Sequence, residues 1–222
     1  MANVMKRPRY TKINGLLYPE MLSPKCFQEA LEYKPKPGDV FIDTYPKCGT
    51  TWMQNNQLGF GYWDGEFDDF FELFMDGELP YNDYFDHLLD WYPHRNDPNV
   101  FYTTYEDMKK DIKSVILKLS RFLGDEYIEA IEKDNAVFNN IILYSGFDYM
   151  KKMMSEMRKL RESVDMDFTF TGLNHMYEFN KSLKPPEDLP EFEEVRKGIV
   201  GDWRNHFSVD QTERLNRKFL EK

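Results

Sequence analysis

The sequence predicts an α/β domain in which a parallel sheet is flanked by helices. Two short runs, 39–44 and 99–104, have the β-branched and aromatic composition of buried strands. Each run precedes a segment with helical spacing of apolar residues, and strand–helix alternation is typical of a parallel sheet. The chain has 222 residues, 41% of them hydrophobic, which is enough for one sizeable core. We therefore expect a single domain over residues 1–222.

The first predicted helix covers residues 23–33. Ser23 is a suitable N-cap, and Pro24 stands at the first helical position, where its missing N–H has no cost. The segment 34–38 contains two Pro and a Gly and ends the helix. The first predicted strand, 39–44, then follows directly.

Residues 64–90 are strongly acidic, with ten Asp or Glu and no Lys or Arg. Four Phe within 67–74 recur at helical spacing and predict an amphipathic helix that ends near Gly77. A second helix is expected over about 82–92. We interpret the acids as a solvated outer face and assign them no chemistry.

The second half of the chain is predicted to be mainly helical. The run 99–104 leads into a helix over 108–123, and further helices are expected over about 126–138, 147–161 and 209–220. The Pro- and acid-rich segment 181–194 is expected to be a surface loop or lid. Parallel sheets usually contain about four to six strands. Either further strands escape this pattern, or the chain lacks them.

Composition excludes several classes of protein. The net charge of −10 (29 bases minus 39 acids) argues against general nucleic-acid binding, which needs a field of Lys and Arg. No run approaches the roughly 20 apolar residues of a membrane helix, and no signal peptide or anchor is expected. The two Cys indicate a reducing compartment, so we expect a cytoplasmic location. The His and Cys residues are scattered along the sequence without the spacing of metal ligands, so no metal site is predicted.

The chemistry is expected in the turn Tyr45-Pro-Lys-Cys-Gly-Thr-Thr-Trp52, between the first strand and a helix predicted from about Thr50. Free N–H groups at a helix N-terminus, close approach at Gly49, nearby hydroxyl groups and the charge of Lys47 favour phosphate. The Lys precedes the Gly, so the spacing is not that of nucleotide triphosphatases. From spacing alone, an ordinary surface lysine is an equal alternative.

Three segments in order resemble the cytosolic sulfotransferases. They are the loop 45–52, where the family usually has Ser in place of Cys48, the strand and Tyr-Glu-Asp turn in 99–110, and the Arg-Lys-Gly segment 196–207. The resemblance extends from about residue 10 to the end of the chain. It implies a P-loop-like strand–turn–helix and transfer of a sulfuryl group from 3′-phosphoadenosine 5′-phosphosulfate (PAPS) to a hydroxyl or amine of a small molecule.

The resemblance also implies roles for individual residues. Lys47 would be the catalytic residue that neutralises charge on the leaving oxygen. The 5′-phosphosulfate would be bound by the loop residues Lys47, Cys48, Gly49, Thr50 and Thr51. The adenine would contact Trp52, Tyr105, Ser145, Phe147 and Met150, with Gly146 where the family usually has Ser. The 3′-phosphate would be bound by Arg196, Lys197 and Gly198. Taken singly, the apolar members of these sets are more often core residues.

The segment 204–213 resembles the short element through which members of the family form dimers. It offers Arg204, Val209 and Glu213 as interface residues, and an element of this length gives only a small interface. We interpret His206, within the same segment, as structural.

The chain departs from the family between Trp52 and Asn99. The Lys-Thr-His segment that carries the general base is absent, as is the strand that brings Arg and Ser to the 3′-phosphate. We therefore expect an incomplete sulfotransferase fold whose central strands are missing between about 54 and 65. The other His residues outside the dimer-like segment are His87, His94 and His175. None of them belongs to a sequence motif that would indicate a general base.

Two alternative functions stay open. One is a catalytically inactive remnant that binds PAPS, its product 3′-phosphoadenosine 5′-phosphate (PAP), or only a partner subunit. The other is an unrelated phosphate-loop kinase, which ranks last because no Lys follows Gly49.

Overall fold

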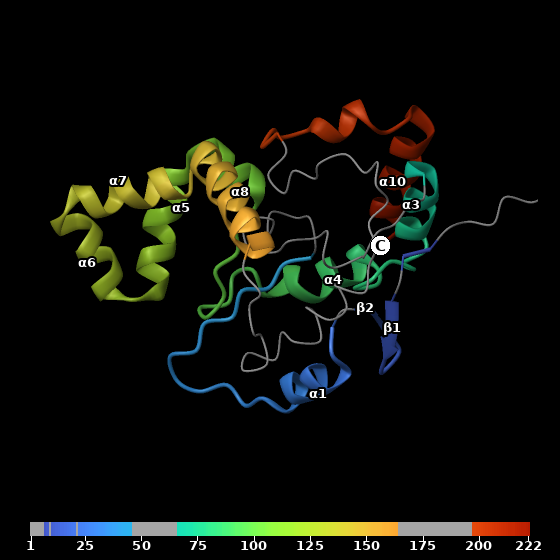
Figure 1. The fold of residues 1–222 in the computed structure, drawn as a ribbon, viewed down its shortest axis with the longest axis horizontal. Helices are drawn as coiled ribbons and strands as arrows, with labels where there is room; N and C mark the ends of the chain where they lie inside the picture. The colour runs from blue at the N-terminus through green and yellow to red at the C-terminus, as the bar shows by residue number, and fades with distance from the viewer. Residues whose placement is uncertain (1–6, 9, 21, 46–65, 164–196) are drawn as a thin grey trace, which may run out of the picture. The chain divides into compact units, whose positions relative to one another are not determined.

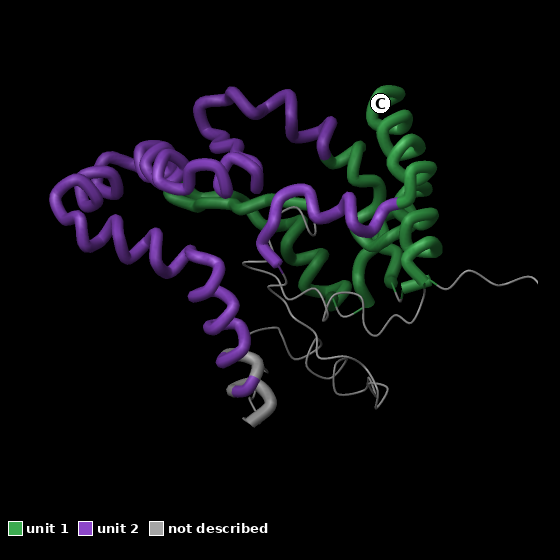
Figure 2. The backbone as a smooth tube through the Cα atoms, turned by 90° about the horizontal axis from the view of Figure 1, so that it is seen from above, with its two compact units in different colours: residues 1–87, 165–193, 208–222 green, residues 88–164, 194–207 purple. Residues whose placement is uncertain are grey.

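The structure is a computed structural model that describes residues 7–8, 10–20, 22–45, 66–163 and 197–222 (Figure 1). The described residues divide into two compact units (Figure 2). The first contains the described residues up to 87 together with 208–222. The second contains the described residues between 88 and 207. The helix predicted from Thr50 and the loop predicted over 181–194 lie outside the described residues.

The first unit begins with a β-hairpin that the sequence analysis misses. Strand β1 (Tyr10–Ile13) pairs antiparallel with β2 (Leu16–Pro19), with Ile13 opposite Leu16. The two residues between the strands have positive φ, 52° at Asn14 and 88° at Gly15. Positive φ at both central residues matches a type I′ turn, for which Asn-Gly is a preferred pair.

The prediction of strands at 39–44 and 99–104 is wrong, because neither run has regular strand structure. Within the described ranges the sheet consists of β1 and β2 only, so the expected parallel sheet is not confirmed. The side chains of Val40, Phe41 and Ile42 are 64%, 65% and 65% exposed. A strand needs a neighbour for its main-chain hydrogen bonds, and these apolar side chains lack the cover of a second layer.

The run 99–104 packs on helical elements instead. The ring of Phe101 lies 5.7 Å from that of Phe122, and Tyr102 meets Tyr92 edge-on at 5.8 Å. Thr104 ends the run as the N-cap of the next helix, its hydroxyl accepting a hydrogen bond from the amide of Asp107 at 3.1 Å.

The helices of the first unit confirm the sequence predictions. Ser23 caps α1 (Pro24–Glu32), and its hydroxyl accepts from the amide of Cys26. Helix α3 (Phe67–Met75) comes from the acidic segment, as does α4 (Tyr84–Trp91), whose residues from 88 on belong to the second unit and continue into a 3-10 turn at 92–94. Helix α10 (Val209–Glu221) begins at a capping box. The apolar core of this unit includes the side chains of Phe71, Leu73, Leu79 and Phe85.

Four of the ten acids contact α10, and the interpretation of the acids as a solvated face is wrong for two of these, Glu72 and Asp83, which are half-buried, whereas Asp68 and Asp86 are exposed. Helices α3 and α10 lie side by side (Figure 1). Gln211 donates to Asp68 at 2.7 Å, and Arg214 makes two bonds of 2.6 Å to Glu72. Lys218 contacts Asp83 at 2.7 Å, and Lys222 contacts Asp86. The contacting residues 211, 214, 218 and 222 follow one another at intervals of three, four and four positions. This spacing places them on one face of the helix.

The second unit is mainly helical in its described part. It contains α5 (Tyr105–Leu123), α6 (Asp125–Lys133), α7 (Asn135–Tyr144), α8 (Phe147–Ser163) and a 3-10 turn, η4 (Asp202–Asn205). Consecutive helices from α5 to α8 contact one another. The buried side chains of Ile116, Ile128, Ile131 and Met150 contribute to its core.

The single helix predicted over 126–138 is wrong, because the chain breaks at Asp134. This residue has an extended conformation, and its carboxylate accepts a hydrogen bond of 2.7 Å from the amide of Ala136. The Asp side chain therefore caps α7 and separates it from α6. Among the described helices, none is both long enough and apolar enough to cross a membrane.

Candidate functional site

Two of the segments expected to bind nucleotide meet in the second unit. Gly198 has a positive φ of 64°, and a Cβ atom placed on it would lie 2.7 Å from Cε2 of Phe147. Real Cβ atoms essentially never approach another atom so closely. The main chain at Gly198 therefore lies directly against the ring of Phe147, and only Gly allows this approach.

The side chain of Lys197, next along the chain, is held by a carboxylate. Its Nζ atom lies 2.9 Å from Oδ1 of Asp202, which also accepts a bond of 3.0 Å from Nδ2 of Asn205. Nε2 of His206 lies 3.3 Å from Oδ2 of the same carboxylate. The side chain of Asp202 is only 9% exposed, whereas those of Lys197 and His206 are each 44% exposed. The turn 197–206 is thus organised around one buried carboxylate.

The predicted adenine-contacting residues of this unit differ in their surroundings. Phe147 is half-buried at the start of α8, whereas Met150 is 8% exposed and belongs to the core. The hydroxyl of Ser145 donates to the carbonyl of Ile141 at 2.7 Å. Tyr105 is half-buried at the start of α5, and burial, together with the neighbouring Glu106 carboxylate, raises its pKa.

The first residue of the predicted phosphosulfate loop, Tyr45, is firmly anchored in the first unit. Tyr45 is 8% exposed, and its hydroxyl donates to the carbonyl of Asn82 at 2.7 Å. Its ring meets Tyr84 edge-on at 5.3 Å and lies 5.6 Å from the imidazole of His87. The amide of Leu17 donates to the Asn82 side chain at 3.0 Å, which ties this anchor to the hairpin.

Several predicted site residues lie outside the described residues. They are Lys47, Cys48, Gly49, Thr50, Thr51, Trp52 and Arg196, and His175 lies there as well. Their roles stay predictions.

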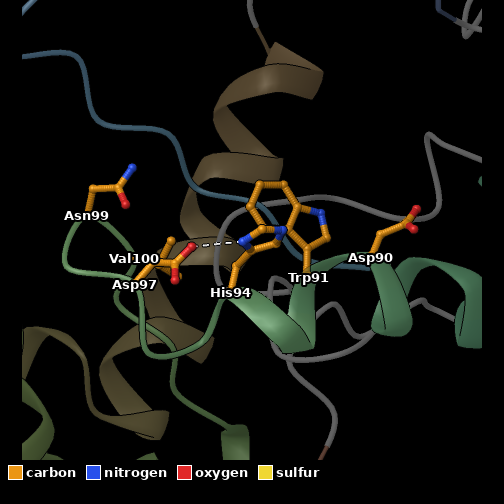
Figure 3. A pocket seen from close by; sticks show the side chains of 6 residues that line it. All are labelled: Asp90, Trp91, His94, Asp97, Asn99 and Val100. Atoms are coloured by element: carbon orange, nitrogen blue, oxygen red, sulfur yellow. Dashed lines mark hydrogen bonds and ion pairs between the residues drawn. The ribbon is translucent and has the colours of Figure 1, made fainter.

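A cavity of about 480 Å³ lies at the end of α4, lined by Asp90, Trp91, His94, Asp97, Asn99 and Val100 (Figure 3). The imidazole of His94 points to Asp97, with Nδ1 2.8 Å from Oδ2 (Figure 3). The side chains of this pair are 57% and 49% exposed. Because ligand pockets usually enclose most of their ligand, this open depression supports no catalytic role for His94.

Comparisons with known proteins decide the family. The model of the sulfotransferase domain matches residues 54–222, about three quarters of the chain. The chain belongs to the sulfotransferase family.

Individual sulfotransferases match over part of their length. An amine sulfotransferase of the rabbit (Oryctolagus cuniculus) is 34% identical over 158 residues, covering 69% of this chain and 43% of the relative. Sulfotransferase 2A6 of the rat (Rattus norvegicus) is 30% identical over 186 residues, with coverages of 84% and 53%. The crystal structure of a mouse sulfotransferase complexed with PAP is 28% identical, covers 71% of this chain and 47% of that protein, and has a TM-score of 0.43.

The matched region contains the second unit and its Phe147–Gly198 contact, whereas the loop 45–52 precedes it. The chain spans only about half the length of these curated relatives. The match thus establishes the family of the chain, but it does not establish the activity of the whole enzyme.

One residue at the site escapes the sequence analysis. Asp202 gathers Lys197, Asn205 and His206, and the signal available in the sequence is a single Asp between Gly201 and Trp203. The contact to Asp202 agrees with the structural role predicted for His206. Among the described residues, no group of three His, Cys, Asp or Glu could hold a metal ion.

Proposed function

We propose that this chain binds PAPS and transfers its sulfuryl group to a hydroxyl or amine of a small molecule. The observation that carries the proposal is the contact of Gly198 with Phe147, within a chain of the sulfotransferase family. It joins the segment expected to hold the 3′-phosphate to the segment expected to contact the adenine. The proposed location is the cytoplasm.

The nucleotide would be recognised at both ends. Lys197, the Gly198 main chain and Arg196 would bind the 3′-phosphate, with Phe147 against the adenine. Lys47, Gly49, Thr50 and Thr51 would bind the 5′-phosphosulfate, and Tyr45 supports that role because it fixes the chain two residues before Lys47. Cys48 would belong to the same loop. Trp52, Tyr105, Ser145 and Met150 would complete the adenine surroundings.

A second candidate function is an inactive sulfotransferase that binds PAPS or PAP without turnover. The observation that favours it is the absence of the Lys-Thr-His segment between Trp52 and Asn99. The exposure of Val40, Phe41 and Ile42 supports a missing block of neighbouring strands. Comparison of the coding transcript with its genomic locus tests this idea, because an intact skipped exon would supply the missing block.

Transfer of a labelled sulfuryl group from PAPS to 2-naphthol separates the two candidates. The purified full chain is compared with Lys47→Ala, which removes the positive charge expected beside the leaving oxygen. Turnover that clearly exceeds that of the variant supports the enzyme. Binding of PAP without turnover supports the inactive alternative.

We also propose a homodimer through Arg204, Val209 and Glu213. Val209 is 77% exposed, and the guanidinium of Arg204 lies over the ring of Trp203 at 4.5 Å. Exposed apolar surface at this position supports an interface, and light scattering of wild type and Val209→Asp tests it. A wild-type monomer at micromolar concentration would contradict the dimer.

A further inference from the structure

The carboxylate of Asp202 is nearly removed from solvent, although the donors that surround it are half exposed. It is 9% exposed and accepts from the ammonium of Lys197, the amide of Asn205 and, in the tautomer with a proton on Nε2, the imidazole of His206. A charged group is retained at such low exposure only where it is paired and hydrogen-bonded. Three donors from one short turn meet this need.

The geometry of the turn fixes Lys197 at two points. Its ammonium is bonded to Asp202 at 2.9 Å, and its main-chain neighbour Gly198 lies against the ring of Phe147. A Lys side chain otherwise has four flexible bonds and loses considerable rotamer entropy when it binds a ligand. The contact to Asp202 removes much of this freedom before any ligand arrives.

The bond to Asp202 leaves the ammonium able to bind an anion. An ammonium group has three N–H donors, and the contact with Oδ1 uses one of them. The side chain of Lys197 is 44% exposed, so water or a ligand can reach it.

We propose that Asp202 is a positioning residue for the 3′-phosphate of the nucleotide, acting through Lys197. The proposal rests on the proposed function, because it takes Lys197 as a ligand of that phosphate. It assigns to Asp202 a part in specificity: the carboxylate orients the ammonium that distinguishes a 3′-phosphorylated nucleotide from one without this group.

The test compares two nucleotides by calorimetry on the full-length chain. PAP carries the 3′-phosphate, and adenosine 5′-phosphate lacks it. In Asp202→Asn we expect the Kd for PAP to rise roughly tenfold, the scale of one hydrogen bond to a charged group. The Kd for adenosine 5′-phosphate should change less than about twofold. The matched control, Asp125→Asn, removes an exposed carboxylate from the same unit and should change neither value.

A double-mutant cycle distinguishes positioning from a structural role. If Asp202 acts through Lys197, then Asp202→Asn in a Lys197→Ala background should cause no further loss of preference for PAP. If Asp202→Asn weakened the binding of both nucleotides equally, the proposal would be overturned, because this result would indicate a general collapse of the turn. An unchanged preference for PAP would overturn it as well.

Folding and the proposed function are controlled separately. Thermal unfolding followed by circular dichroism verifies that each variant is folded. Should Asp202→Asn unfold, Asp202→Glu keeps the charge but displaces it by one methylene, and the proposal requires the same selective loss of PAP affinity. A folded wild-type chain that binds neither nucleotide would contradict the proposed function itself and the positioning role with it.

Discussion

The main chain of Gly198 lies so close to the ring of Phe147 that a side chain added at this position would force the ring to move. Phe147 and Gly198 are 51 positions apart in the sequence, yet both belong to segments expected to bind the same nucleotide. The contact therefore supports a shared role in binding.

Gly198→Ala should weaken the binding of PAP by at least about tenfold. The new methyl group would collide with Phe147, and positive φ adds a backbone cost of about 1 kcal/mol for a non-glycine residue. Calorimetry measures the affinity. Gly38→Ala is the matched control, because Gly38 also has positive φ, 91°, but nothing lies within 4 Å of its added Cβ. Equal effects of the two substitutions would contradict a specific role of the contact.

Lys47→Ala should weaken nucleotide binding by about 2–4 kcal/mol, the scale of one charge-assisted donor in a closed site. Lys12→Ala removes the same charge from the hairpin and serves as the control. Calorimetry with PAP measures both. An affinity that Lys47→Ala leaves unchanged would refute the role of the loop.

Lys218→Met should destabilise the first unit by roughly 2 kcal/mol, the scale for leaving a partly buried charge without its main partner. Lys218 and Asp83 are each 15% exposed, and their Nζ–Oδ2 distance is 2.7 Å. Urea unfolding measures the loss. The additional substitution Asp83→Asn should recover part of it, since the stranded charge is then removed. Strictly additive effects of the two substitutions would show that the pair is not coupled.

The Arg214–Glu72 pair should make stability depend on pH in the acid range. Hydrogen bonds from Arg214 hold the pKa of Glu72 below its ordinary value. The unfolded chain therefore takes up this proton more readily than the folded chain. The contribution of the pair is fully present above the ordinary Glu pKa of about 4.3 and is lost as the pH falls through the lower, folded-state pKa.

Glu72→Gln tests this dependence by chemical unfolding between pH 7 and pH 3. The variant should be less stable than wild type at pH 7, and the difference should shrink as the pH falls below about 4. Asp83 contributes in the same direction: burial raises its pKa, but the bonds from Lys218 and the Phe85 amide outweigh this and lower it. A difference between Glu72→Gln and wild type that stays constant with pH would contradict the expected linkage.

Local signals in the sequence predict the helices better than the sheet. Ser23 and Pro24 locate the start of α1, because capping depends on adjacent residues. The Asn14-Gly15 turn was equally local and could have revealed the hairpin. The run 39–44 has strand composition, but a strand also needs partners distant in sequence, and composition cannot supply them.

The resemblance to the family predicts the candidate site much better than the spacing of residues in the sequence does. Lys197, Gly198 and Phe147 are found by their match to family segments, and the structure places Gly198 against Phe147. Asp202 is missed because its role appears only when the turn closes and brings Lys197 to its carboxylate. Similarly, 142 positions separate Arg214 from Glu72, so their pairing depends on the tertiary fold.

Calorimetric titration of the full-length chain with PAP tests the central claim most directly. We predict one binding site per chain, with an affinity that falls in Gly198→Ala and stays unchanged in Gly38→Ala. A wild-type chain that unfolds cooperatively on heating, and so has a stable fold, but releases no heat of binding with PAP at any temperature tried would contradict it.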